Sequence, residues 1–127
     1  AETRIPIYRA DGHFRIPAIL NESAPVTLTL ADEAPLSMAS ISLLESAGVP
    51  IAPDTPKRMI RFAGRQIKGS VIKVPWIRIG VHGLGPIDFL ALEPELDDMG
   101  PLLNTAQLDR YQLEWNYERL ELDVRER

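Results

Sequence analysis

Prolines and glycines are so frequent in this chain that they favour short helices and strands over long ones. The 127 residues include 11 prolines and 8 glycines. Proline has no backbone N–H to give to a helix or a sheet, and glycine is the residue that tight turns most often require. We therefore expect a chain of short strands joined by turns.

Apolar side chains recur at every second position between these turns, which is the pattern of a half-buried strand. Residues 26–30 show it most clearly, because two threonines alternate with valine and leucines. In a later strand, residues 76–81, we expect Ile77, Ile79 and Val81 to share one face. The other expected strands cover residues 4–8, 13–20, 58–62, 65–74, 87–92, 112–116 and 120–124.

Two short helices are expected among these strands. Ser40 can cap a helix over residues 40–47, which Gly48 would end. A second helix is expected to begin at Asn104, because Asn104 and Gln107 have the spacing of a capping box. The whole pattern predicts an all-β, barrel-like domain.

Composition excludes several classes of protein. The net charge is −4 without a Lys/Arg run, which argues against nucleic-acid binding. The longest uncharged stretch, residues 34–44, is too short for a membrane helix, so no transmembrane segment is expected. With no cysteine and only two histidines, the chain offers no disulfide, no thiol nucleophile and no multi-histidine metal centre. We expect no cofactor and no metal, and one domain over residues 1–127.

Three further features have ordinary interpretations. The glycines of residues 64–70 have phosphate-loop spacing, but the lysine precedes the second glycine, so a nucleotide site is not expected. The acidic residues 93–98 could ligate calcium, although a solvated acidic loop is the simpler interpretation. Trp76 and Trp115 are expected to be core or interface aromatics.

The segment VTLTLADEAPLSMAS, residues 26–40, resembles the first signature of the retropepsin-like aspartic proteases. In that family a strand ends in two apolar residues and Asp-Thr/Ser-Gly-Ala, and each subunit of a homodimer gives one catalytic Asp. The order of elements is similar too. Residues 13–30 look like the opening hairpin, 61–70 like the flap, 101–110 like the second signature and 113–122 like the closing strands. The resemblance implies an all-β retropepsin-like acid-protease barrel with one or two short helices.

The resemblance places the catalytic carboxylate on Asp32, where two such groups across a dimer would share a proton and activate water. Four residues depart from the family pattern. Glu33 stands in place of a hydroxyl residue, Ala34 in place of glycine, Pro35 follows in the same loop, and Asn104 replaces the glycine of the second signature. An ionised Glu33 only accepts hydrogen bonds, so it cannot bridge the dimer axis as a hydroxyl does. These departures predict impaired catalysis.

The resemblance also implies substrate-binding positions. These are Glu33 and Ala34 beside the catalytic position and Ala63, Gly64 and Arg65 at the flap tip. The catalytic position and the flap tip have plainer alternatives. Asp32 can be a turn residue that accepts backbone N–H bonds, and residues 63–65 can be an ordinary hairpin turn.

Three functions remain open on the sequence. The first is a catalytically impaired, dimeric retropepsin-like domain that binds an extended peptide or protein. The second is an active homodimeric aspartic endopeptidase that uses Asp32 from each subunit. The third is an unrelated β-barrel interaction module. Because related bacterial domains are often exported and the chain begins with a small residue, we expect a periplasmic or otherwise exported protein.

Overall fold

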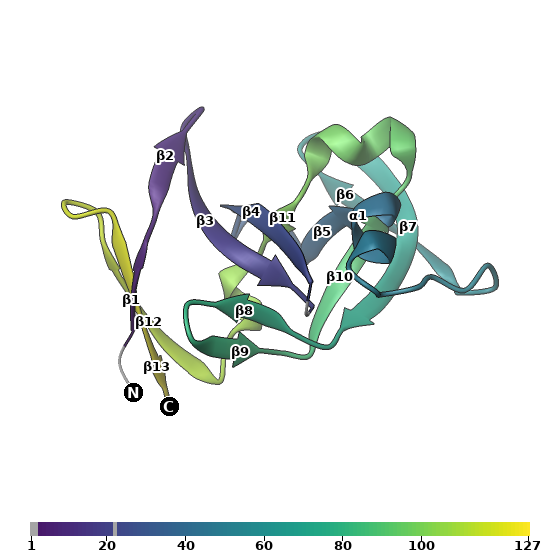
Figure 1. Ribbon diagram of the computed structural model, residues 1–127. Helices are drawn as coiled ribbons and strands as arrows, with labels where there is room; N and C mark the ends of the chain where they lie inside the picture. The colour runs from purple at the N-terminus through teal and green to yellow at the C-terminus, as the bar shows by residue number, and fades with distance from the viewer. Residues whose placement is uncertain (1–2, 22) are drawn as a thin grey trace.

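The computed structural model describes residues 3–21 and 23–127, and these residues form two β-sheets (Figure 1). The smaller sheet brings the two ends of the chain together. Its strands are antiparallel and lie in the order β1 (Thr3–Pro6), β13 (Glu121–Glu126), β12 (Tyr111–Asn116). It stands to one side of the larger sheet in Figure 1.

The larger sheet contains the other strands of the described residues. Its hydrogen-bonded path runs β6 (Lys57–Phe62), β7 (Arg65–Val74), β10 (Ile87–Leu92), β5 (Ser37–Ser40), β11 (Leu102–Leu103), β4 (Ala24–Leu30), β3 (His13–Leu20), β8 (Ile77–Ile79) and β9 (His82–Leu84). A further strand, β2 (Tyr8–Ala10), pairs with β3. The path ends at β6 and β9, so the described strands form an open sheet and not a closed barrel.

The short strand β11 is the centre of the larger sheet. It runs parallel to β4, with Leu103 opposite Leu30, and antiparallel to β5. Backbone bonds extend the pairing at both ends: the Thr29 N–H donates to the Pro101 carbonyl (3.1 Å), and the Ala31 N–H donates to the Leu103 carbonyl (3.0 Å). The end of β4 is thereby fixed against residues that follow it by more than 70 positions.

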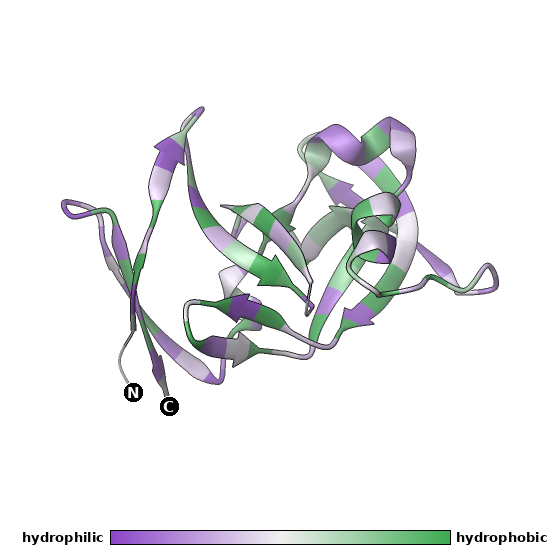
Figure 2. Ribbon diagram, viewed as in Figure 1, coloured by the Kyte–Doolittle hydropathy of each residue, from purple (hydrophilic) through white to green (hydrophobic). Residues whose placement is uncertain are grey.

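Alternating hydropathy builds the core, as the mixed colours along most strands in Figure 2 indicate. The main cluster includes residues of both sheets, among them Ile5, Leu28, Phe89 and Leu122. A second cluster, which includes Ala31, Met38 and Leu90, packs where β4, β5 and β10 lie. The smaller sheet is therefore joined to the larger one by a shared apolar core.

Most expected elements are found at the expected places. The all-β fold is confirmed, as are the helix after Ser40 and the hairpin of residues 58–74. The helix is α1 (Ile41–Ser46), and the Ser40 hydroxyl accepts the Leu43 N–H at 3.1 Å. None of the helices among the described residues is long and apolar enough to cross a membrane.

Three local expectations were wrong. The first expected strand is two, because β1 pairs with β13 and β2 pairs with β3. Val81 is 77% exposed: Gly80 turns the chain with a φ of +61°, so the alternation of Ile77 and Ile79 stops there. Most of the acidic residues lie in a 3₁₀ helix, η1 (Pro94–Met99), and not in a loop. The short helix expected at Asn104 is found as the 3₁₀ helix η2 (Thr105–Gln107), with Asn104 as its N-cap.

The capping box expected at Asn104 is half present. The Asn104 side chain accepts the Ala106 N–H at 2.8 Å, as a cap should. The Gln107 side chain does not return to the Asn104 N–H, which donates to the Ser37 hydroxyl instead (3.0 Å). Gln107 Oε1 accepts both the N–H and the hydroxyl of Ser37. Both residues thus bind Ser37 on β5, and the bond between them is a backbone one, from the Gln107 N–H to the Asn104 carbonyl (3.1 Å).

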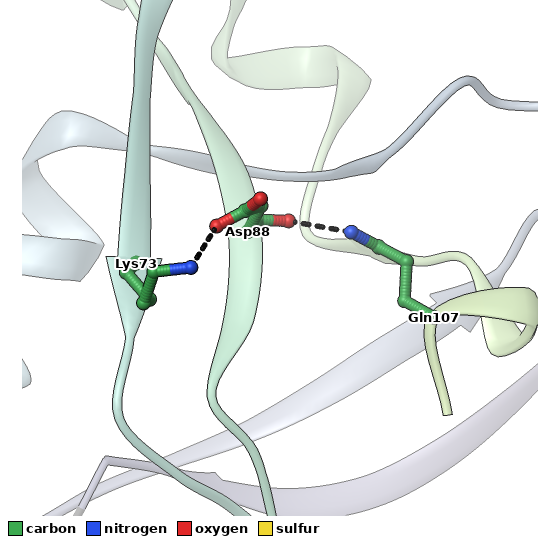
Figure 3. Close-up of polar contacts among 3 residues, drawn as sticks. All are labelled: Lys73, Asp88 and Gln107. Atoms are coloured by element: carbon green, nitrogen blue, oxygen red, sulfur yellow. Dashed lines mark hydrogen bonds and ion pairs between the residues drawn. The ribbon is translucent and has the colours of Figure 1, made fainter. Parts of the chain in front are cut away.

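Gln107 extends this network to a second strand, β10. Its Nε2 donates to the Asp88 carbonyl on β10 at 2.9 Å, and the Asp88 side chain pairs with Lys73 on β7 at 3.2 Å (Figure 3). Ser37 is fully buried and Asn104 is 7% exposed, so their polar groups depend on these bonds. The exposed Lys73–Asp88 pair contributes little to stability by comparison.

Asn104→Ala is predicted to destabilise the protein by about 1–3 kcal/mol, because it leaves a buried carbonyl and a partly buried N–H without their partners. The bonds at risk are those of the Asn104 side chain to the Ala34 carbonyl (2.6 Å) and the Ala106 N–H. Urea unfolding measures the change. The control is Asn116→Ala, which removes one exposed bond to the Arg119 N–H and should cost clearly less. Equal losses for the two variants would contradict the prediction.

Candidate functional site

Asp32 lies immediately after β4, where the pairing of β4 with β11 stops. Its Oδ1 atom accepts two hydrogen bonds from Thr105, from the backbone N–H at 2.8 Å and from the hydroxyl at 2.6 Å. A carboxylate oxygen has two lone-pair sites, so this atom is fully occupied. Within the described residues Oδ2 has no such donor, and Asp32 is exposed. Asp32 therefore presents one carboxylate oxygen to solvent and uses the other to hold its own turn.

The loop after Asp32 is closed by main-chain and side-chain bonds. The Ala34 N–H donates to the Ala31 carbonyl at 3.1 Å, and the Ala34 carbonyl accepts from Asn104 Nδ2. Ala34 is 2% exposed and belongs to the second core cluster, together with Ala31. Its methyl group is packed inward, so Ala34 can contribute only backbone atoms to a ligand site.

Glu33 is exposed and is placed between two clefts, both of which it lines. In the part of the chain that the structure describes, its carboxylate has no ion-pair or hydrogen-bond partner. The neighbouring Asp32 lines only the smaller of these clefts. Glu33 is thus an unpaired negative charge beside Asp32.

The smaller cleft has a volume of about 210 Å³ and an aromatic wall. The Phe14 and Tyr117 rings lie 4.7 Å apart between centroids, and Tyr117 stacks on Trp115 at 6.5 Å. Trp115 is half-buried against the main core, as expected for a core or interface aromatic, whereas Trp76 is 47% exposed and so is not a core residue. Besides these aromatics, the cleft is lined by Leu30, Asp32, Glu33 and Thr105.

The larger cleft has a volume of about 770 Å³ and lies between the β6–β7 hairpin, the start of β3 and the end of η1. Ala63 lines it; Ala63 and Gly64 form the hairpin tip, with φ of +54° and +73°. Two successive left-handed residues are the geometry of a tight two-residue hairpin turn. Arg65 points to Asp98, with which it pairs at 3.6 Å. Of the expected ligand-binding positions, Glu33 and Ala63 share this cleft.

The acidic residues 93–98 are partly engaged in ion pairs with the same hairpin. Lys57 pairs with Glu93 at 2.9 Å, and Arg65 pairs with Asp98. Among residues 3–21 and 23–127, no three acidic or histidine side chains converge as they would around a metal ion. The stretch thus links η1 to the two strands of the hairpin.

Sequence reasoning missed three polar residues that build the site: Ser37, Thr105 and Gln107. Thr105 binds Asp32, and the other two fix the turn that carries Thr105. The one sequence signal for these residues is that each comes shortly after a few apolar residues. Their partners lie about 70 positions away, so that signal could not have named the contact.

Comparison with known proteins identifies the architecture. No protein-family profile matches the chain, and no curated protein matches it. Among solved structures, a retropepsin-like aspartic protease from Rickettsia conorii matches with a TM-score of 0.70 and 20% sequence identity. The match covers 98% of this chain and 89% of the other. The expected resemblance is therefore confirmed at the level of the fold: the chain has the fold of a retropepsin-like aspartic protease.

Proposed function

We propose that this chain is an aspartic-protease-type domain that binds extended peptide as a homodimer and has lost efficient hydrolysis. The observation that carries the proposal is the Asp32–Glu33 pair. Asp32 stands at the strand end with one free carboxylate oxygen, and Glu33 stands unpaired beside it. The ligand-sized cleft next to this pair supports binding, while the second carboxylate counts against catalysis.

Impaired hydrolysis follows from charge and geometry. In a two-fold dimer built around Asp32, each subunit would bring Glu33 as well, so four carboxylates would gather where the chemistry needs two. Like charges at close range disfavour the shared ionisation on which the mechanism depends. No hydroxyl is present at position 33 to bridge the axis, and a misplacement of about 1 Å can cost ~100-fold in rate.

A second candidate, an active homodimeric aspartic endopeptidase, is favoured by one observation. Thr105 leaves Asp32 Oδ2 unoccupied, so a water molecule could be held there. The same geometry serves either function, and only an activity measurement separates them.

The dimer is supported by two features near Asp32. The outer edge of β12 has no strand beside it among the described residues, and an unpaired edge is a template for strand addition. Tyr117, which follows β12, is 53% exposed and lies over the cleft that contains Asp32. One Asp32 is also half of an aspartic-protease site, which a second copy would complete.

We further propose that the protein is exported, because related bacterial retropepsin-like domains often are. Fractionation of cells that carry the complete gene, with processing of the precursor as a second readout, tests the location. A precursor without a signal peptide or membrane anchor would contradict it.

The protein is predicted to be a homodimer in solution. Light scattering over a range of concentrations should give twice the chain mass of 14.2 kDa. Tyr117→Glu should weaken the dimer, because it places a charge on the aromatic wall beside Asp32. Met59→Glu is the matched control, since Met59 is 59% exposed on the distant strand β6. A clean monomer at high concentration would refute the dimer.

Wild-type protein is predicted to show little or no endopeptidase activity on unfolded proteins or peptide libraries at acidic and neutral pH. Mass spectrometry of the digests measures it, with Asp32→Ala as the baseline. The double variant Glu33→Thr with Ala34→Gly removes the extra charge and restores the family residues, so activity is expected to appear there if the fold is otherwise competent. Wild-type cleavage that Asp32→Ala abolishes would establish the second candidate and overturn the first.

A further inference from the structure

The larger cleft differs from an ordinary apolar groove in the charges that line it. Its walls carry the basic side chains of His13, Arg15 and Arg61 and the acidic side chains of Glu33 and Asp98. Basic and acidic groups of this kind usually neutralise each other in pairs. Here they do not pair with one another: Arg15 pairs with Asp11 and Asp98 with Arg65, and neither Asp11 nor Arg65 lines the cleft. The charges that remain give the cleft a chemical preference.

Arg15 has a donor that the protein leaves unused. Its Nε atom is buried, and it has no hydrogen-bond partner among the described residues. The ion pair that Arg15 makes uses Nη2 and reaches Asp11 at 3.5 Å, and the Asp11 side chain is 89% exposed. A pair at that distance in water holds the guanidinium weakly. Nε is too buried for a ligand to reach, so an acidic ligand would bind the Nη atoms, which within the described residues are engaged only by this exposed Asp11 pair.

Arg61 provides a second free cation on the opposite wall. It lies near the end of β6, two residues before Ala63, and no ion pair or hydrogen bond engages it within the described part of the chain. The acidic side chain Asp98 is not available to it at pairing distance, because Asp98 pairs with Arg65. Arg61 thus lines the cleft as a cation that is not paired within the described residues.

The alternation of β3 explains why the basic groups gather on one wall. Residues 13 and 15 are separated by two positions and therefore lie on the same face of the strand. Arg15 is directly opposite Thr29 of β4, which also lines the cleft. The core face of β3 is formed by alternate residues further along the strand, such as Ile16 and Ala18.

We propose that the cleft selects an extended peptide with an acidic side chain, which Arg15 and Arg61 bind, flanked by apolar side chains. The apolar flanks would contact Phe62, Met99 and Leu102, which line the same cleft. Glu33 on the loop wall repels an acidic group, so it directs that group toward the two arginines. This inference rests on the proposed peptide-binding function and adds the chemical class of the ligand.

The test uses immobilised octapeptides of leucine, valine, phenylalanine and alanine that carry one Glu, Gln or Lys at each position in turn. Wild-type protein should bind the best Glu peptide about tenfold more tightly than its Gln counterpart, because charge-assisted bonds are about twice as strong as neutral ones. Arg61→Gln and Arg15→Gln should each reduce that ratio severalfold. Raised salt should also reduce it.

Arg58→Gln is the matched control, because Arg58 is exposed on the same strand and does not line the cleft. It should leave the Glu-to-Gln ratio unchanged. Peptides that bind equally well with Glu and Gln would overturn the acidic preference and leave the peptide-binding function standing. An equal loss of Glu and Gln binding in Arg61→Gln would overturn recognition through charge. If none of the peptides bound, both the inference and the proposed function would be refuted.

Discussion

The placement of β11 between β4 and β5 is the constraint on which the candidate site depends. Two residues, Leu102 and Leu103, pair with strands that precede them by more than 60 positions. This pairing brings the turn that carries Thr105 next to the end of β4, where Asp32 lies. So short a strand could not hold this register by its ladder bonds alone. The buried bonds of Ser37 with Asn104 and Gln107 supply the rest.

Local signals predicted the elements well, and non-local contacts set the limits of that prediction. The helix after Ser40 and the hairpin at Ala63-Gly64 are specified by residues within a few positions, so the sequence was enough. Val81 shows where such reasoning fails. The alternation of a strand predicts that Val81 lies on the face of Ile77 and Ile79, but the chain reverses at Gly80. The partition of residues 4–8 into β1 and β2 depends on β13, more than 110 positions away, and so had no local signal.

Non-local contacts also limit what the sequence predicts about the site, as Asn104 shows. Asn104 was interpreted as one of four departures that damage the family pattern. In the structure it forms four hydrogen bonds and ties down the Ala34 carbonyl. The resemblance places glycine at both of these positions, so the two departures are coupled: the methyl of Ala34 is packed inward and the amide of Asn104 fixes its backbone. Departures that support one another preserve the loop, which leaves Glu33 as the change that bears most directly on the chemistry.

The positions of Asp32 and Glu33 are such that the proposed loss of hydrolysis would leave the proposed peptide binding intact. Asp32 faces the small aromatic cleft near the edge where a second copy would dock, whereas the larger cleft is lined by Glu33 and the hairpin. In the proposed dimer a charge at position 33 would disturb the carboxylate pair at the axis. In the larger cleft the same side chain is the acidic group that contrasts with Arg15 and Arg61, so the proposed loss of hydrolysis and the proposed ligand preference would share one side chain. Because the cleft is shaped by β3, η1 and the hairpin, its shape does not depend on a competent carboxylate pair.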